Sequence, residues 1–78
     1  MPKYFLHIKD GQALIEDPDG ADYPNPAAAH AEAVQGARDI LAQQLKNGIP
    51  LDGHAIEIRD ETGALCETVL FRDVYRAM

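Results

Sequence analysis

Three basic residues, each followed directly by an aspartate, stand near the expected ends of strands. They are Lys9, Arg59 and Arg72. Together with His7 they predict a small cationic cluster of the kind that binds a carboxylate or a phosphate. The alternative is that each basic residue and its aspartate belong to a surface turn, with an ion pair worth about 0–1 kcal/mol. The residue types favour the second interpretation, and the sequence leaves both open.

The histidines and the cysteine lack the spacing of a zinc or nucleophilic site. His7, His30, His54 and Cys66 fall on four different expected elements, with no closely spaced pair to place two ligands on one face. The chain contains no serine, which excludes serine catalysis. A cysteine within an alternating strand more often serves as a small apolar side chain. We therefore expect no catalytic residue, no zinc and no cofactor.

The acidic stretch at residues 17–22 suggests a calcium loop, because calcium takes several oxygen ligands from a sharply turning backbone. The spacing does not fit. Counted from Asp17, the glycine comes fourth instead of sixth, and the twelfth position is Ala28 instead of a bidentate glutamate. We expect a solvated turn without a metal.

Length and composition describe one small globular domain, residues 1–78. The net charge is −6 and the seven lysines and arginines are scattered, so the chain lacks the basic surface that nucleic acids and anionic membranes require. Cys66 is the only cysteine, which fits a reducing compartment. No apolar run approaches the roughly 20 residues of a membrane span, and the N-terminus lacks a signal-peptide pattern. These features predict a cytoplasmic protein that binds neither nucleic acid nor membrane.

One long helix is predicted over residues 26–47, about 33 Å at roughly 1.5 Å per residue. Asn25 is a favoured N-cap and Pro26 suits the first helical position, whereas Gly48 and Pro50 end the helix. Its inward stripe has three- and four-residue spacings and consists of Ala29, Ala33, Ala37, Ile40, Leu41 and Leu45. The alanines predict a close approach of the helix to its neighbours.

Alternation with a period of two predicts strands over residues 3–9, 13–15, 55–59 and 64–72, with a short edge pairing at 21–23. The order hairpin, helix, hairpin predicts an α+β fold, in which an antiparallel sheet of about four strands carries the long helix across one face. The expected sheet residues under the helix are Leu6, Ile8, Ile56, Ile58, Val69 and Phe71.

The same alternation leaves Phe5, Cys66 and Leu70 on the open face of the sheet. A contiguous apolar patch on so small a domain usually marks an interface. An exposed strand edge is a second liability that pairing would remove. We therefore expect a homodimer that forms through this face or through an edge beside it.

Several segments resemble a family of short bacterial domains of unknown function, whose members open with a Tyr-Phe-Phe-His-like strand. The matching segments are residues 4–11 (Tyr-Phe-Leu-His-Ile-Lys-Asp-Gly), 17–20, 28–38, 51–53 and 69–73 (Val-Leu-Phe-Arg-Asp). Where this family often has a proline before the phenylalanine, the chain has Leu70, which leaves one more backbone donor. The resemblance implies no catalytic residues.

A weaker similarity covers residues 3–45. The order strand, turn, strand, proline-containing loop and alanine- and glutamate-rich helix resembles the partial fold of HicB-type antitoxins, without the Pro-x-x-Pro-Gly loop of that family. This similarity implies a small toxin as protein partner.

The sequence as a whole favours a non-catalytic interaction or regulatory module that self-associates. Two alternatives stay open. One is an antitoxin-like protein with a small protein partner. The other is a domain that binds a small anion through Lys9, Arg59, Arg72 and His7.

Overall fold

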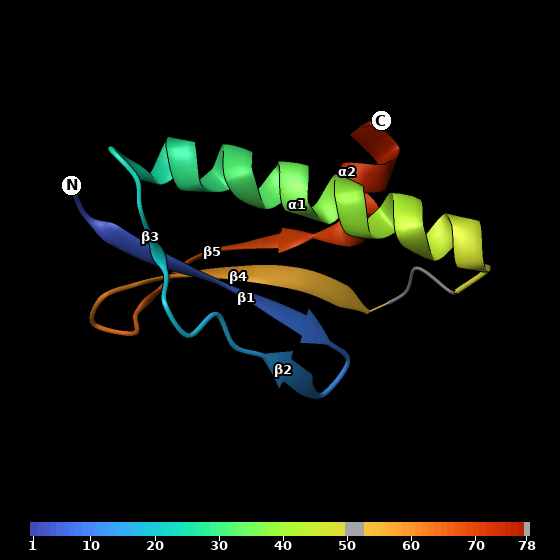
Figure 1. Ribbon diagram of the computed structural model, residues 1–78, viewed down its shortest axis with the longest axis horizontal. Helices are drawn as coiled ribbons and strands as arrows, with labels where there is room; N and C mark the ends of the chain where they lie inside the picture. The colour runs from blue at the N-terminus through green and yellow to red at the C-terminus, as the bar shows by residue number, and fades with distance from the viewer. Residues whose placement is uncertain (50–52, 78) are drawn as a thin grey trace.

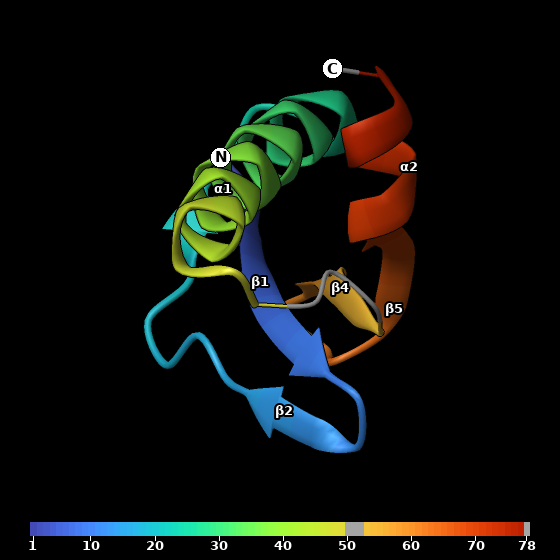
Figure 2. The same cartoon turned by 90° about the vertical axis from the view of Figure 1, so that its right-hand side faces the viewer.

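The computed structural model describes residues 1–49 and 53–77. Within them the elements are β1 (Lys3–Asp10), β2 (Ala13–Ile15), β3 (Ala21–Asp22), α1 (Pro26–Asn47), β4 (His54–Asp60), β5 (Leu65–Leu70) and α2 (Phe71–Ala77). The sheet is antiparallel in the order β2-β1-β4-β5, and β3 pairs with the same edge of β1 as β2. Both helices lie on one face and leave the other uncovered (Figure 1, Figure 2). The predicted α+β fold is confirmed.

Helix α1 has the predicted bounds because its ends carry the predicted caps. The Asn25 side-chain oxygen accepts a hydrogen bond of 2.9 Å from the Ala28 amide, and the proline after Asn25 lies in the first turn. At the other end Gly48 takes the left-handed conformation, φ 70°, which lets the last amides fold back onto free carbonyls. The predicted stop at Pro50 and most of the family-like segment 51–53 lie outside the described residues.

The core lies between α1 and the covered face of the sheet, as predicted. Four helix residues are fully buried there: Ala29, Ala33, Ala37 and Leu41. They meet Tyr4, Ile56, Ile58, Val69, Phe71 and Val74, with Leu6 and Ile8 partly buried at the margin. Because alanine side chains are short, the first half of α1 packs its backbone closely on the sheet.

The predicted inward stripe of α1 is wrong at its C-terminal end. Leu45 is 52% exposed, whereas Gln44 is buried instead. At 3.6 residues per turn, each four-residue step from Ala29 to Leu41 rotates the stripe by about 40°. A three-residue step from Leu41 brings Gln44 back toward the sheet, and a fourth four-residue step carries Leu45 into solvent.

The predicted last strand, residues 64–72, is too long. Strand β5 ends at Leu70, and Phe71 begins α2. Phe71 and Val74 are both buried, and a three-residue spacing of apolar side chains suits one face of a helix. Phe71 therefore reaches the predicted core from α2 instead of from a strand.

A β-bulge changes which residues of β5 share the open face. The register shifts at Ile58 and Arg59, so that Glu67 pairs with Ile58 and Leu65 pairs with Arg59. Cys66 is the extra residue between the two pairs. Leu65, half exposed, thus takes the place on the open face that simple alternation assigned to Cys66.

Candidate functional site

A turn that begins at Asp17 closes the edge of β1 between β2 and β3. The Asp17 carboxylate accepts hydrogen bonds from the amides of Leu6, Asp19 and Gly20 at 3.3, 3.4 and 3.1 Å. The Asp17 amide donates to Nδ1 of His7 at 3.0 Å. The predicted solvated turn is therefore docked on the sheet, and His7 is one of its anchors.

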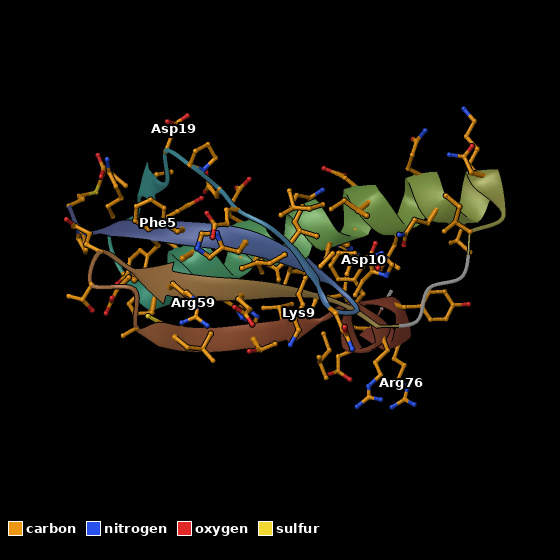
Figure 3. The ribbon with its side chains drawn as sticks, turned by 90° about the horizontal axis from the view of Figure 1, so that it is seen from below. Phe5, Lys9, Asp10, Asp19, Arg59 and Arg76 are labelled. Atoms are coloured by element: carbon orange, nitrogen blue, oxygen red, sulfur yellow. The ribbon has the colours of Figure 1, made fainter. Side chains whose placement is uncertain are left out.

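The same turn covers Phe5. Gly20 lies against the phenyl ring, because a Cβ at this position would stand 2.8 Å from Cε2 of Phe5. The ring of His7 also stacks on the Phe5 ring, with centroids 6.2 Å apart and an angle of 19° between the planes. Figure 3 shows Phe5 on β1 near the turn that carries Asp19. Phe5 is half-buried by contacts within the fold itself.

An ion pair occupies the middle of the open face. Nε and Nη2 of Arg59 donate to Oε1 of Glu57 at 3.2 and 3.0 Å. Nη1 of Arg59 donates to the Gly63 carbonyl at 2.8 Å. The Glu57 side chain is only 13% exposed. All three guanidinium nitrogens of Arg59 are therefore engaged within the β4–β5 hairpin.

The structure does not bring the four members of the predicted anion cluster together. His7 and Arg59 make the internal hydrogen bonds described above. Lys9 and Arg72 line a shared groove at the other end of the open face, and no ion pair among the described residues involves either of them. In Figure 3, Lys9 lies near the opposite end of β1 from Phe5.

The three predicted interface residues also lie apart. Phe5 pairs with Arg59 across β1 and β4, whereas Leu70 pairs with Ala55 near the other end of β4. The central ion pair separates the two apolar side chains. Cys66 is exposed in the bulge of β5.

The free edge of β5 borders a second groove on the helix side, with a volume of about 360 Å³. Helix α1 lines it with His30, Val34 and Arg38, one residue per turn of a single helix face. Nδ1 of His30 lies 2.8 Å from Oε2 of Glu67, a contact without in-line hydrogen-bond geometry. The four-residue spacing on α1 is the sequence signal that could have revealed this groove.

His54, at the start of β4, makes polar contacts with the end of α1 and the end of β1. Nε2 of His54 lies 3.2 Å from Nε2 of Gln44 and 3.3 Å from Oδ1 of Asp10. The His54 ring also stacks on Phe71, with centroids 5.5 Å apart. No group of three histidine, cysteine or acidic side chains within residues 1–49 and 53–77 could hold a metal ion. These contacts give His54 a structural role between α1, β1 and α2.

Asp60 organises the turn between β4 and β5. Its Oδ1 accepts hydrogen bonds from the Thr62 hydroxyl, the Thr62 amide and the Ala64 amide at 2.6, 2.9 and 3.1 Å. The hydroxyl of Thr62, followed by the Ala64 amide, favours the charged carboxylate and lowers the pKa of Asp60 below its ordinary value of 3.8. The ionised form of Asp60 thus holds the turn that leads into the edge strand.

We expect Thr62→Val to raise the pKa of Asp60, because this change removes the hydroxyl donor and keeps the side-chain shape. An NMR titration of the Asp60 carboxyl carbon measures the pKa in both proteins. Since the folded pKa is lowered, Asp60 stabilises the fold above its unfolded pKa, and this contribution is lost as the pH falls through the folded pKa. An identical pKa in the two proteins would contradict the assignment of the hydroxyl as the main cause.

Comparison with known proteins adds a family. Among the described residues, no helix is long and apolar enough to cross a membrane. No curated protein and no solved structure matches the chain. The family model DUF6894, which describes a domain of unknown function, matches residues 3–72, from β1 into α2. The resemblance noted in the sequence is thereby confirmed, and the chain belongs to the DUF6894 family of domains of unknown function.

Proposed function

We propose that this domain is a non-catalytic interaction module that self-associates by pairing the β5 edges of two copies. The observation that carries the proposal is the free edge of β5, which ends the sheet and has six residues without proline or lysine. Such an edge presents unpaired backbone groups that natural proteins usually cover or block. The other edge is blocked, since β2 and β3 have three and two residues and the Asp17 turn lies between them.

Backbone amides point alternately to the two sides of a strand, and this alternation identifies the amides of β5 that point away from the sheet. The Leu6 amide points away from β4, because it donates to the carboxylate at the other edge of β1. Leu6 pairs with Ile58, so Ile58 directs its own amide toward β5, where it pairs with Glu67. Alternation along β5 then directs the amides of Thr68 and Leu70 outward. Both amides are available to a second strand.

In the proposed dimer, a two-fold axis passes between the Thr68 residues of the two copies. This register uses both outward amides and places no two like charges opposite each other. Thr68 then pairs with Thr68 of the second copy, and threonine pairs across antiparallel strands are favourable. Leu70 pairs with Cys66 of the second copy. Glu67 comes opposite Val69, so the two acidic side chains do not face each other.

The groove beside the edge supplies a complementary charge for the second copy. Val69 and Arg38 line this groove together, and no ion pair within the described part of the chain involves Arg38. Since Glu67 of the second copy lies opposite Val69 in this pairing, its carboxylate comes to the side of the groove that carries Arg38. Charge complementarity of this kind fixes the register of an interface.

Leu70→Pro tests the proposal, because proline removes the outward amide and no hydrogen bond within the sheet. We expect the unmodified protein to sediment at micromolar concentration with twice the chain mass of 8.5 kDa. Each dimer of Leu70→Pro loses two amide donors, each worth about 0.5–1.5 kcal/mol, so the dissociation constant should rise about fivefold or more.

The matched control is Leu70→Ala, which shortens the same side chain and keeps the amide. We expect this variant to stay dimeric, with a folded circular dichroism spectrum in both variants. A strictly monomeric unmodified protein would contradict self-association. Equal loss of the dimer in Leu70→Ala and Leu70→Pro would instead contradict the backbone pairing of β5.

A further inference from the structure

The groove shared by Lys9 and Arg72 lies on the open face and has a volume of about 650 Å³. This volume is within the usual range of small-molecule sites. The strands contribute one row of side chains across the sheet, in which Lys9 pairs with Ala55 and Ala55 pairs with Leu70. Because the Ala55 side chain is small, the protein surface at the middle of this row is lower than at Lys9 and Leu70 on either side.

Two cationic side chains flank this low point. Neighbouring strands are roughly 4.8 Å apart, so the backbones of Lys9 and Leu70 stand about 10 Å apart on either side of Ala55. Arg72 follows Leu70 by two residues and lines the same groove. Lysine and arginine side chains are long enough for both charges to reach one anion above Ala55.

The acidic residue in the groove does not neutralise these charges. Oε1 of Glu57 already accepts two hydrogen bonds from Arg59, so that pair is satisfied internally. Lys9 and Arg72 have no ion pair among the described residues. Two uncompensated cations thus share one groove in a protein whose net charge is −6.

Three apolar side chains, Ala55, Leu65 and Leu70, form part of the groove. Ala55 is 5% exposed, Leu70 is half-buried, and Leu65 extends the apolar surface along β5 at 50% exposure. Thr68 lies between the two leucines and adds one hydroxyl. A ligand that matches this surface carries an anionic head and an apolar chain of a few carbons.

We propose that this groove binds small organic carboxylates with a short aliphatic chain. The carboxylate lies between Lys9 and Arg72, because a guanidinium and an ammonium group both donate charge-assisted hydrogen bonds to carboxylate oxygens. The aliphatic chain lies over Ala55 and Leu70 toward Leu65. This site uses the open face and does not depend on pairing of the β5 edges.

Titration with hexanoate, followed by two-dimensional amide NMR of the full chain, tests the proposal. We expect saturable shifts at millimolar concentration in the amides of Ala55, Thr68 and Leu70. Hexanamide has the same chain without the charge and should cause no saturable shift. Lys9→Gln together with Arg72→Gln should weaken hexanoate binding at least about tenfold, because the carboxylate loses both of its charge-assisted donors.

The matched control is Lys3→Gln together with Arg76→Gln, which removes the same two charge types outside the groove. This control should bind hexanoate like the unmodified protein. Equal weakening in both double variants would overturn the site, because it would show attraction to overall charge. Equal binding of hexanamide, equal binding of inorganic phosphate, or the absence of saturable shifts in these three amides would also overturn the proposal.

Discussion

Leu41→Ala and Ile58→Ala should each lower the free energy of unfolding by about 2–5 kcal/mol, because each deletion loses apolar burial and leaves a cavity. Leu41 is 0% and Ile58 is 1% exposed, and they meet in the one core that joins α1 to the sheet. A domain of this size has a total stability of roughly 5–10 kcal/mol. Either variant should therefore lose a large share of its stability, and at physiological temperature a measurable fraction should be unfolded.

Urea denaturation followed by circular dichroism measures these losses, and α1 supplies its own control. Leu45→Ala makes the same chemical change one turn after Leu41, at a position that is 52% exposed. We expect it to cost less than about 1 kcal/mol. Equal costs for Leu41→Ala and Leu45→Ala would show that the buried face of α1 is assigned wrongly.

Gly20→Ala should destabilise the domain by about 2–5 kcal/mol, from two causes that add. Gly20 has a φ of 66°, where an alanine is disfavoured by roughly 1–2 kcal/mol. The added Cβ would also stand 2.8 Å from the Phe5 ring and 3.0 Å from the Tyr4 carbonyl oxygen. Relieving these contacts requires the docked turn to move off β1, at a further cost of about 1–3 kcal/mol.

Gly11→Ala separates the two causes. Gly11 has a similar φ of 61°, but no atom lies within 4 Å of the Cβ position. Denaturant melts of the two variants should differ by the cost of the clash alone. Phe5→Leu, which replaces the ring by a smaller side chain, should recover part of the loss in Gly20→Ala and none in Gly11→Ala. Equal effects of the two glycine substitutions would remove the role of the turn as a cover for Phe5.

The parts of the fold that the sequence predicted are those determined locally. Helix α1 begins after a capping asparagine and ends before a glycine, and both signals lie within a few residues of the ends that they define. The strands of the two hairpins follow from alternation and glycine turns. Two errors arose where a regular period was extended across an irregularity, at Phe71 and at the bulge around Cys66, and a third, at Leu45, arose because four-residue steps drift around a regular helix.

The candidate site was harder to predict, because it depends on which partner each polar side chain selects. His7 contacts Asp17, ten residues later, and this contact exists only once the turn docks on β1. The pairing of Glu57 with Arg59 is a local signal that could have been used, since residues two apart on a strand share one face. That signal would have removed Arg59 from the cationic cluster and left Lys9 and Arg72.

The asymmetry between the two edges of the sheet determines how far association can proceed. A sheet with two open edges can add copies at both ends without limit, which is the geometry of a growing fibre. Here the Asp17 carboxylate occupies the β1 edge at Leu6 and β2 beside it has only three residues, so β5 is the longer free edge. In the proposed dimer, pairing through β5 would use the longer free edge of each copy and end growth at a closed pair. If the proposed dimer forms, loss of the acidic turn would leave the β1 edge open at Leu6, and further copies could then add to the sheet at that edge.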